Sequence, residues 1–109
     1  MKKLICLIIL FFIGSSVNAQ IVVTEFNAEW NAANKVAWVD KLSDCDITKV
    51  DITKEADLQQ KHKVVIVPTI IIFKDGEEIK RYQADLSFKM LATRKEIQNF
   101  INDQIMSDF

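Results

Sequence analysis

The chain has 109 residues, a formal net charge of −1 and 50% hydrophobic residues. This length fits a single domain, and the hydrophobic content excludes a disordered chain. A nucleic-acid-binding surface would be basic, and one His with two Cys supplies too few ligands for a usual zinc site, so we expect neither nucleic acid nor a metal or cofactor.

The segment 1–19 has the pattern of a cleavable signal peptide. Two lysines precede the ten-residue apolar run Leu4–Ile13, and Val17-Asn18-Ala19 forms a small-residue cleavage site. An apolar run of this length is too short to cross a bilayer, which takes ~20 residues in a helix. The sequence therefore predicts an exported protein, periplasmic or secreted, with residues 20–109 as its mature domain and no membrane span after cleavage.

Strands and helices alternate in the first half of this domain. Ile21–Asn27 is apolar and β-branched and predicts a strand, and Asn31–Ser43 predicts an amphipathic helix. The alternating residues Ile47–Ile52 predict a second strand, and Thr53–His62 predicts a polar helix. Two strands joined through a helix in one sheet are expected to be parallel, with a right-handed crossover.

A hairpin is predicted in the second half. The apolar stretch Val64–Phe73 contains Pro68, and because proline cannot sit inside a central strand, the strand should begin near Thr69. Asp75-Gly76 is a hairpin signal, and Glu77–Gln83 forms the returning strand.

The chain should end in a helix over residues 94–106. Thr93 and Glu96 have the spacing of a capping box, and isoleucines and a phenylalanine follow at helical intervals. The predicted order is β-α-β-α-β-β-α, an α/β domain with a mixed four-stranded sheet flanked by helices.

Two segments resemble the thioredoxin family. Glu25–Lys35, with the sequence EFNAEWNAANK, is similar to its active-site segment, and Val67–Glu77 is similar to its cis-proline strand and hairpin. The resemblance covers about residues 21–83 well and the final helix by position. It implies a minimal thioredoxin-like fold without the family's first strand and helix, and a cis bond before Pro68.

The resemblance fails at the two redox cysteines, which Asn31 and Asn34 replace. Thiol–disulfide exchange needs a thiolate and a resolving thiol, and an amide supplies neither, so we expect no dithiol reductase activity at Asn31-Ala32-Ala33-Asn34. Asparagine is a strong helix N-cap, so the two residues could have a structural role. Alternatively, they could hydrogen-bond a ligand in the groove.

The resemblance also implies a peptide-docking groove. In thioredoxins the residue before the cis-proline pairs with a bound chain, so Val67 beside Pro68 would offer its backbone to an extended peptide. Trp30 would form a wall of this groove, or else pack as a half-buried aromatic. The expected binding residues are Trp30, Asn31, Asn34, Val67 and Pro68.

Glu25 and Lys49 match a buried acid and a nearby lysine of thioredoxins. Without thiols the acid's proton-transfer role lapses. The simpler interpretation is an ion pair between neighbouring parallel strands, and a buried Glu without a partner would have a raised pKa.

Cys45 is the one cysteine left after cleavage, since Cys6 lies in the signal segment. Its neighbours Asp44 and Asp46 should raise the thiol pKa, which favours an incidental, half-buried thiol. The alternative is a homodimer through a bare edge at strand 47–52, which would bring two copies of Cys45 together.

Two further features have alternative interpretations. His62 follows Lys61 near a helix end and fits a solvated cap better than a metal ligand. Phe88, Met90 and Leu91 either cover the core or form a partner-binding patch.

The sequence as a whole predicts a module that binds or scaffolds a protein or extended peptide and is not an enzyme. The competing hypothesis is monothiol exchange, or a mixed disulfide, through Cys45 in cell redox homeostasis.

Overall fold

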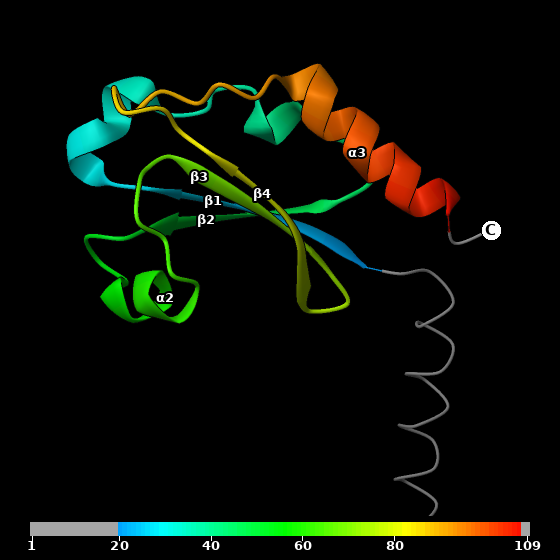
Figure 1. The fold of residues 1–109 in the computed structure, drawn as a ribbon, viewed down its shortest axis with the longest axis horizontal. Helices are drawn as coiled ribbons and strands as arrows, with labels where there is room; N and C mark the ends of the chain where they lie inside the picture. The colour runs from blue at the N-terminus through cyan, green and yellow to red at the C-terminus, as the bar shows by residue number, and fades with distance from the viewer. Residues whose placement is uncertain (1–19, 108–109) are drawn as a thin grey trace, which may run out of the picture.

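The computed structural model describes residues 20–107, so the predicted signal peptide and Cys6 lie outside the described residues. Four strands form one sheet in the order β2-β1-β3-β4 (Figure 1). Strand β1 pairs in parallel with β2 and antiparallel with β3, and β3 pairs antiparallel with β4. The predicted mixed sheet is therefore confirmed. The strand bounds are β1 Ile21–Asn27, β2 Asp46–Asp51, β3 Thr69–Lys74 and β4 Glu77–Gln83.

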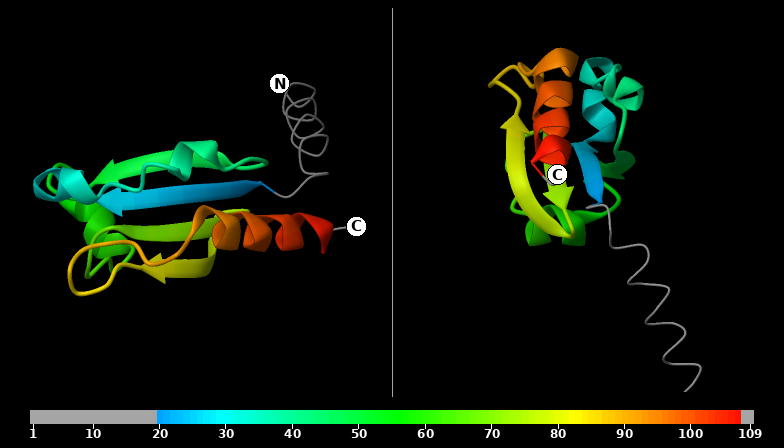
Figure 2. Two further views of the ribbon diagram at one scale, coloured as in Figure 1. Left: turned by 90° about the horizontal axis from the view of Figure 1, so that it is seen from above. Right: turned by 90° about the vertical axis from the view of Figure 1, so that its right-hand side faces the viewer.

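Helices cover both faces of this sheet. Helix α3 (Arg94–Met106) lies on one face and α2 (Ala56–Lys61) on the other, as Figures 1 and 2 show. Side chains alternate between faces along a strand, so Ile70 and Ile72 join the cluster beneath α3, whereas Ile71 belongs to the cluster on the α2 side. All three side chains are fully buried, and as successive residues of β3 they contribute to the clusters on both faces of the sheet.

The predicted helix over 31–43 is wrong. Two short 3-10 helices take its place, η1 (Glu29–Asn34) and η2 (Val39–Lys41). The backbone N–H of Val36, which would continue a helix, donates instead to the buried carboxylate of Glu25 at 3.0 Å. Lys35 accordingly adopts an extended ψ of 151°. A side chain eleven positions earlier in the chain thus ends the helix.

The other predicted elements differ only at their ends. Strand β2 begins one residue earlier than expected, and α2 begins three residues later and ends one residue earlier than the predicted helix 53–62. The hairpin turn is confirmed at Asp75 and Gly76, with φ of 53° and 86°. Helix α3 has the predicted bounds, and the Thr93 hydroxyl accepts from the Glu96 N–H at 3.1 Å.

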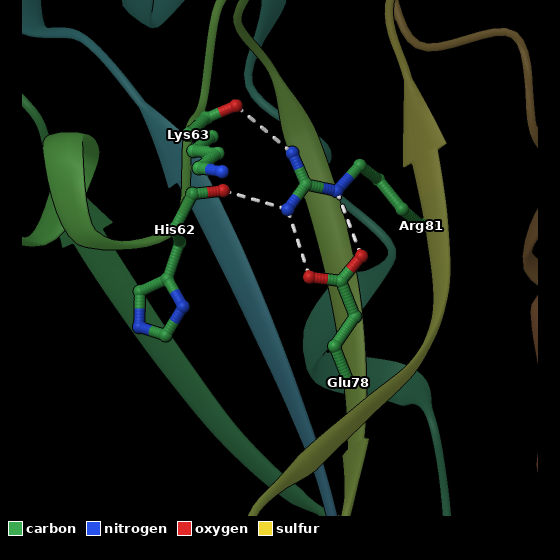
Figure 3. A network of polar contacts seen from close by, with 4 residues as sticks. All are labelled: His62, Lys63, Glu78 and Arg81. Atoms are coloured by element: carbon green, nitrogen blue, oxygen red, sulfur yellow. Dashed lines mark hydrogen bonds and ion pairs between the residues drawn. The ribbon is translucent and has the colours of Figure 1, made fainter.

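Arg81 of β4 fastens the end of α2 to the sheet (Figure 3). Its Nη2 donates to the His62 carbonyl at 2.6 Å, and its Nη1 donates to the Lys63 carbonyl at 3.0 Å. Glu78 holds the guanidinium from the other side through Nε and Nη2, at 2.9 and 2.8 Å. The carbonyls of the two residues that follow α2 therefore gain charge-assisted partners.

The side chain of His62 is not a solvated cap. His62 does end α2, but its ring is half-buried and lies 5.6 Å from the Phe26 ring and 5.3 Å from the Phe73 ring, centroid to centroid. The imidazole therefore packs as an aromatic against the core.

Among residues 20–107, no helix has both the length and the apolar character needed to cross a membrane.

Candidate functional site

The site lies at the end of the sheet where β1 continues into η1 and where the chain enters β3. The Val67–Pro68 peptide bond immediately before β3 is cis, which confirms the expectation from the resemblance. Both residues are buried. Thr69 at the start of β3 donates its hydroxyl to the Ile66 carbonyl at 2.6 Å and so fixes the turn.

Asn31 joins three segments of this site. Its side chain is buried, with 4% of the residue exposed. Its Nδ2 donates to the Asn27 Oδ1 at 3.1 Å and to the Phe88 carbonyl at 3.2 Å, and lies 3.5 Å from the Val67 carbonyl. Its Oδ1 accepts from the Asn34 Nδ2 at 2.9 Å. Because an amide NH2 has two hydrogens, the two shorter donor contacts are the strong ones.

The predicted capping role of the two asparagines is therefore wrong. The residue that precedes η1 is Ala28, with no side-chain cap, and Asn31 lies inside η1 at a kink with φ −110° and ψ 21°. The two side chains instead bond to each other, and Asn31 reaches partners 36 and 57 positions away.

A groove of about 140 Å³ lies beside Val67. Trp30, 62% exposed, forms one wall, and its ring meets that of Phe88 edge-on at a centroid distance of 5.3 Å. The remaining lining residues are Ile52, Gln59, Val65 and Ile66. Of the five predicted binding residues, only Trp30 and Val67 line the groove. Asn31 contacts the backbone carbonyls of two lining residues, Val67 and Phe88, and Asn34 and Pro68 do not line it.

Phe88 comes from a loop whose role sequence reasoning only partly anticipated. Asp85 folds this loop by accepting from the backbone N–H of Ser87 at 2.9 Å and of Lys89 at 3.2 Å. Met90 packs against the core, as one interpretation expected, whereas Phe88 reaches the groove with a positive φ of 64°. The aromatic and apolar residues between two predicted elements were the available signal.

Glu25 is 5% exposed and does not form the predicted ion pair with Lys49, although the two residues are register partners on β1 and β2. Lys49 extends instead to Asp40 of η2, with Nζ 2.7 Å from Oδ2 on the surface. Burial raises the pKa of the Glu25 carboxyl, against the hydrogen bond from Val36 and the nearby charge of Lys49, which lower it.

Cys45 is half-buried and packs against the cluster beneath α3. Burial raises the pKa of its thiol to about 11, and the charges of Asp46 and Asp44 add to this effect. Within residues 20–107, no three His, Cys, Asp or Glu side chains are grouped so that they could hold a metal ion.

We predict that Asn31→Ala destabilises the fold by about 2–3 kcal/mol, because the buried Asn31 side chain is lost and the part-buried Phe88 carbonyl and Asn34 amide lose their partner. Asn34→Ala, at a half-buried position with one of these bonds, should cost about 1 kcal/mol. Urea unfolding measures both. Equal costs for the two variants would contradict the joining role of Asn31.

Glu25→Gln should stabilise the protein increasingly as pH rises. A carboxyl with a raised folded-state pKa contributes stability fully at pH below its ordinary value of 4.5, and loses it as pH rises through the folded value. Glutamine keeps an acceptor for the Val36 N–H without this titration. The unfolding free energies of the two proteins, compared from pH 4 to 9, test this, and a difference that is independent of pH would refute it.

Comparison with known proteins supports the fold. A thioredoxin from Chlamydia trachomatis is 33% identical over 74 residues, which are 62% of this chain and 72% of that protein. Thioredoxin Y1 of Arabidopsis thaliana chloroplasts is 38% identical over 50 residues, 46% of this chain. The match with thioredoxin Y1 covers 29% of that protein. A second match, with thioredoxin H2 from the same plant, covers 51% of it, so the chain spans only part of the length of these relatives.

Solved structures are similar over most of the chain. Thioredoxin-2 of the malaria parasite, a component of that parasite's protein secretion machinery, has a TM-score of 0.64 and 23% identity over 78% of this chain and 84% of its own. A thioredoxin from Schistosoma mansoni has a TM-score of 0.61 and 20% identity, over 86% and 85%. At this identity the likeness concerns the fold alone.

The family model for thioredoxin matches residues 14–102. The four-stranded sheet, the cis-proline before β3 and this match over most of the chain agree, and the chain belongs to the thioredoxin family.

Proposed function

We propose that this thioredoxin-family domain is an exported binding module that docks an extended polypeptide and does not carry out dithiol exchange. The observation that carries the proposal is the groove beside Val67, walled by the rings of Trp30 and Phe88. Its volume of about 140 Å³ suits one apolar side chain of a peptide better than a whole small molecule.

A free backbone donor beside the groove supports strand addition. The Val67 N–H donates no hydrogen bond within residues 20–107. Buried backbone N–H groups are nearly always paired, so an incoming carbonyl would give this group the partner it lacks. Main-chain bonds of this kind provide affinity, and a side-chain pocket beside them provides selectivity.

Exposed apolar side chains at the groove provide the second support. Trp30 is 62% and Val65 82% exposed, and both line the groove. Tryptophans in such positions often dominate binding energy. The amides of Asn31 and Asn34 satisfy each other and the surrounding backbone, so they position the groove wall and offer no nucleophile.

Peptides selected from a displayed random library should bind the protein through this groove. Trp30→Ala should lower the affinity for the selected peptide by about tenfold or more in calorimetric titration, because it removes one wall of the groove. Met106→Ala serves as the matched control, since Met106 is 70% exposed, ends α3 and lies outside the groove. It should change affinity by less than about twofold.

Two outcomes would oppose the docking function. One is a library that yields no enriched peptide. The other is an enriched peptide whose affinity is the same for the parent protein and for Trp30→Ala.

The competing thiol function through Cys45 is disfavoured by the environment of that residue. With a pKa of about 11, roughly one thiol in ten thousand is ionised at pH 7. Alkylation by iodoacetamide should therefore be about a hundredfold or more slower than that of a free cysteine of pKa ~8.5, and should accelerate steadily up to pH 10. A rate at pH 7 equal to that of free cysteine would restore the monothiol hypothesis.

Export and oligomeric state are tested together by the intact mass of the natural protein, purified without reductant. We predict one chain that begins at Gln20 and carries a free thiol. Strand β2 lies at an edge of the sheet, as the dimer hypothesis requires, but its outward residues include charged Asp46 and Lys49, which oppose edge pairing. A doubled mass that reductant halves would favour the Cys45-linked homodimer instead.

A further inference from the structure

A second cavity lies on the other side of η1 and shares no lining residue with the peptide groove. Its volume is about 350 Å³, within the range of small-molecule sites. It lies where β1 and β2 end beneath the segment 29–40, the cyan ribbon at one end of the sheet in Figure 1. The apolar side chains that line it are all short, and they belong to Ala28, Ala32, Val36, Ala37 and Val50.

The absence of a long helix accounts for this space. Glu25 accepts the Val36 N–H at 3.0 Å, and the chain leaves η1 through the extended backbone of Lys35. Alanines then line the cavity in place of larger side chains, so little fills the volume between the 3-10 segments and the strand ends.

Glu25 lines this cavity and is buried, with 5% of the residue exposed. Its Oε2 accepts from Val36, whereas its Oε1 accepts no hydrogen bond within residues 20–107. No fully shielded side-chain nitrogen or oxygen of the described residues lacks a partner, so Oε1 must be reachable from the cavity. A buried carboxylate that has a hydrogen bond but no ion-pair partner is costly, and a bound cation would offset that cost.

The remaining charges at the cavity favour a cation. Lys49 is neutralised by Asp40, with Nζ 2.7 Å from Oδ2. Of the other charged lining residues, Glu29 and Asp51 are acidic and only Lys35 is basic. Counting Glu25, the lining therefore has a net negative charge beside its apolar wall.

We propose that this cavity binds a small primary ammonium compound with a short aliphatic body. The ammonium group donates to Oε1 of Glu25, and the hydrocarbon part packs against Ala28, Ala32 and Val36. The site is independent of the peptide groove, so either function can fail without the other.

Affinity for such a ligand should rise with pH, because the ligand binds the ionised carboxyl. Burial raises the pKa of Glu25, with Lys49 and Lys35 opposing and Asp40 reinforcing the shift. Protonation of Glu25 at low pH therefore competes with the ligand, whose own ammonium stays charged throughout.

The experiment is an amide NMR titration with n-butylammonium chloride at pH 5 and pH 8, with n-butanol as the neutral probe of the same shape. We expect saturable shifts at Val36 and Ala32, several-fold tighter binding at pH 8, and at least tenfold weaker binding of n-butanol. Trp30 and Val67 should not shift.

Three variants complete the test. Glu25→Gln keeps an acceptor for the Val36 N–H. It should lower the affinity for butylammonium at least tenfold and abolish the pH dependence of that affinity. Ala32→Leu keeps Glu25 and should block the cavity. Asp57→Asn removes an exposed carboxylate on α2, outside the cavity, and should bind like the parent protein.

The proposal is overturned if no saturable shift occurs at Val36, if n-butanol binds as tightly as butylammonium, or if Glu25→Gln binds butylammonium unchanged. The NMR spectrum of each variant reports directly whether it is folded, so a misfolded variant is not mistaken for loss of binding.

Discussion

The hydrogen bonds of one buried amide hold the site together. Asn31 ties the end of β1, through Asn27, to the loop that carries Phe88, and also contacts the carbonyl of Val67. These segments are far apart in sequence, and none of them is fixed by a regular helix at this point. The groove between Trp30 and Phe88 therefore depends on a polar side chain that a low-dielectric surrounding makes costly to leave unpaired.

This arrangement explains how a thioredoxin-family domain retains an ordered site without its thiols. The positions that resemble the redox pair still face each other, but Asn34 donates to Asn31 where a disulfide would otherwise form. Beneath them Glu25, whose counterpart in the resemblance is a buried acid, uses its carboxylate to bond the Val36 N–H. One consequence is the break after η1, and another is the cavity beside Glu25. The hydrogen bonds of Asn31 and Glu25 shape the surfaces on the two sides of η1.

Local signals predicted the elements whose causes are local. The bounds of α3 followed from Thr93 and from the spacing of Ile97 and Ile101, and the hairpin followed from Asp75-Gly76. Local signals wrongly predicted one helix over 31–43, because the group that ends η1 is the Glu25 side chain on β1, which is not local to that segment.

The sequence predicted only those parts of the candidate site that belong to recognisable motifs. Trp30 and the cis Val67–Pro68 bond came from the resemblance. The role of Asn31 did not, since its partners lie up to 57 positions away, and neither did the packing of His62 between two rings.

The claim that Asn31 holds the site together is tested most directly by the NMR exchange rate of its side-chain amide protons. We predict at least tenfold slower exchange with solvent than for exposed asparagine side chains, together with a contact to Phe88. Exchange as fast as that of an exposed amide would contradict the claim that this side chain holds the site together.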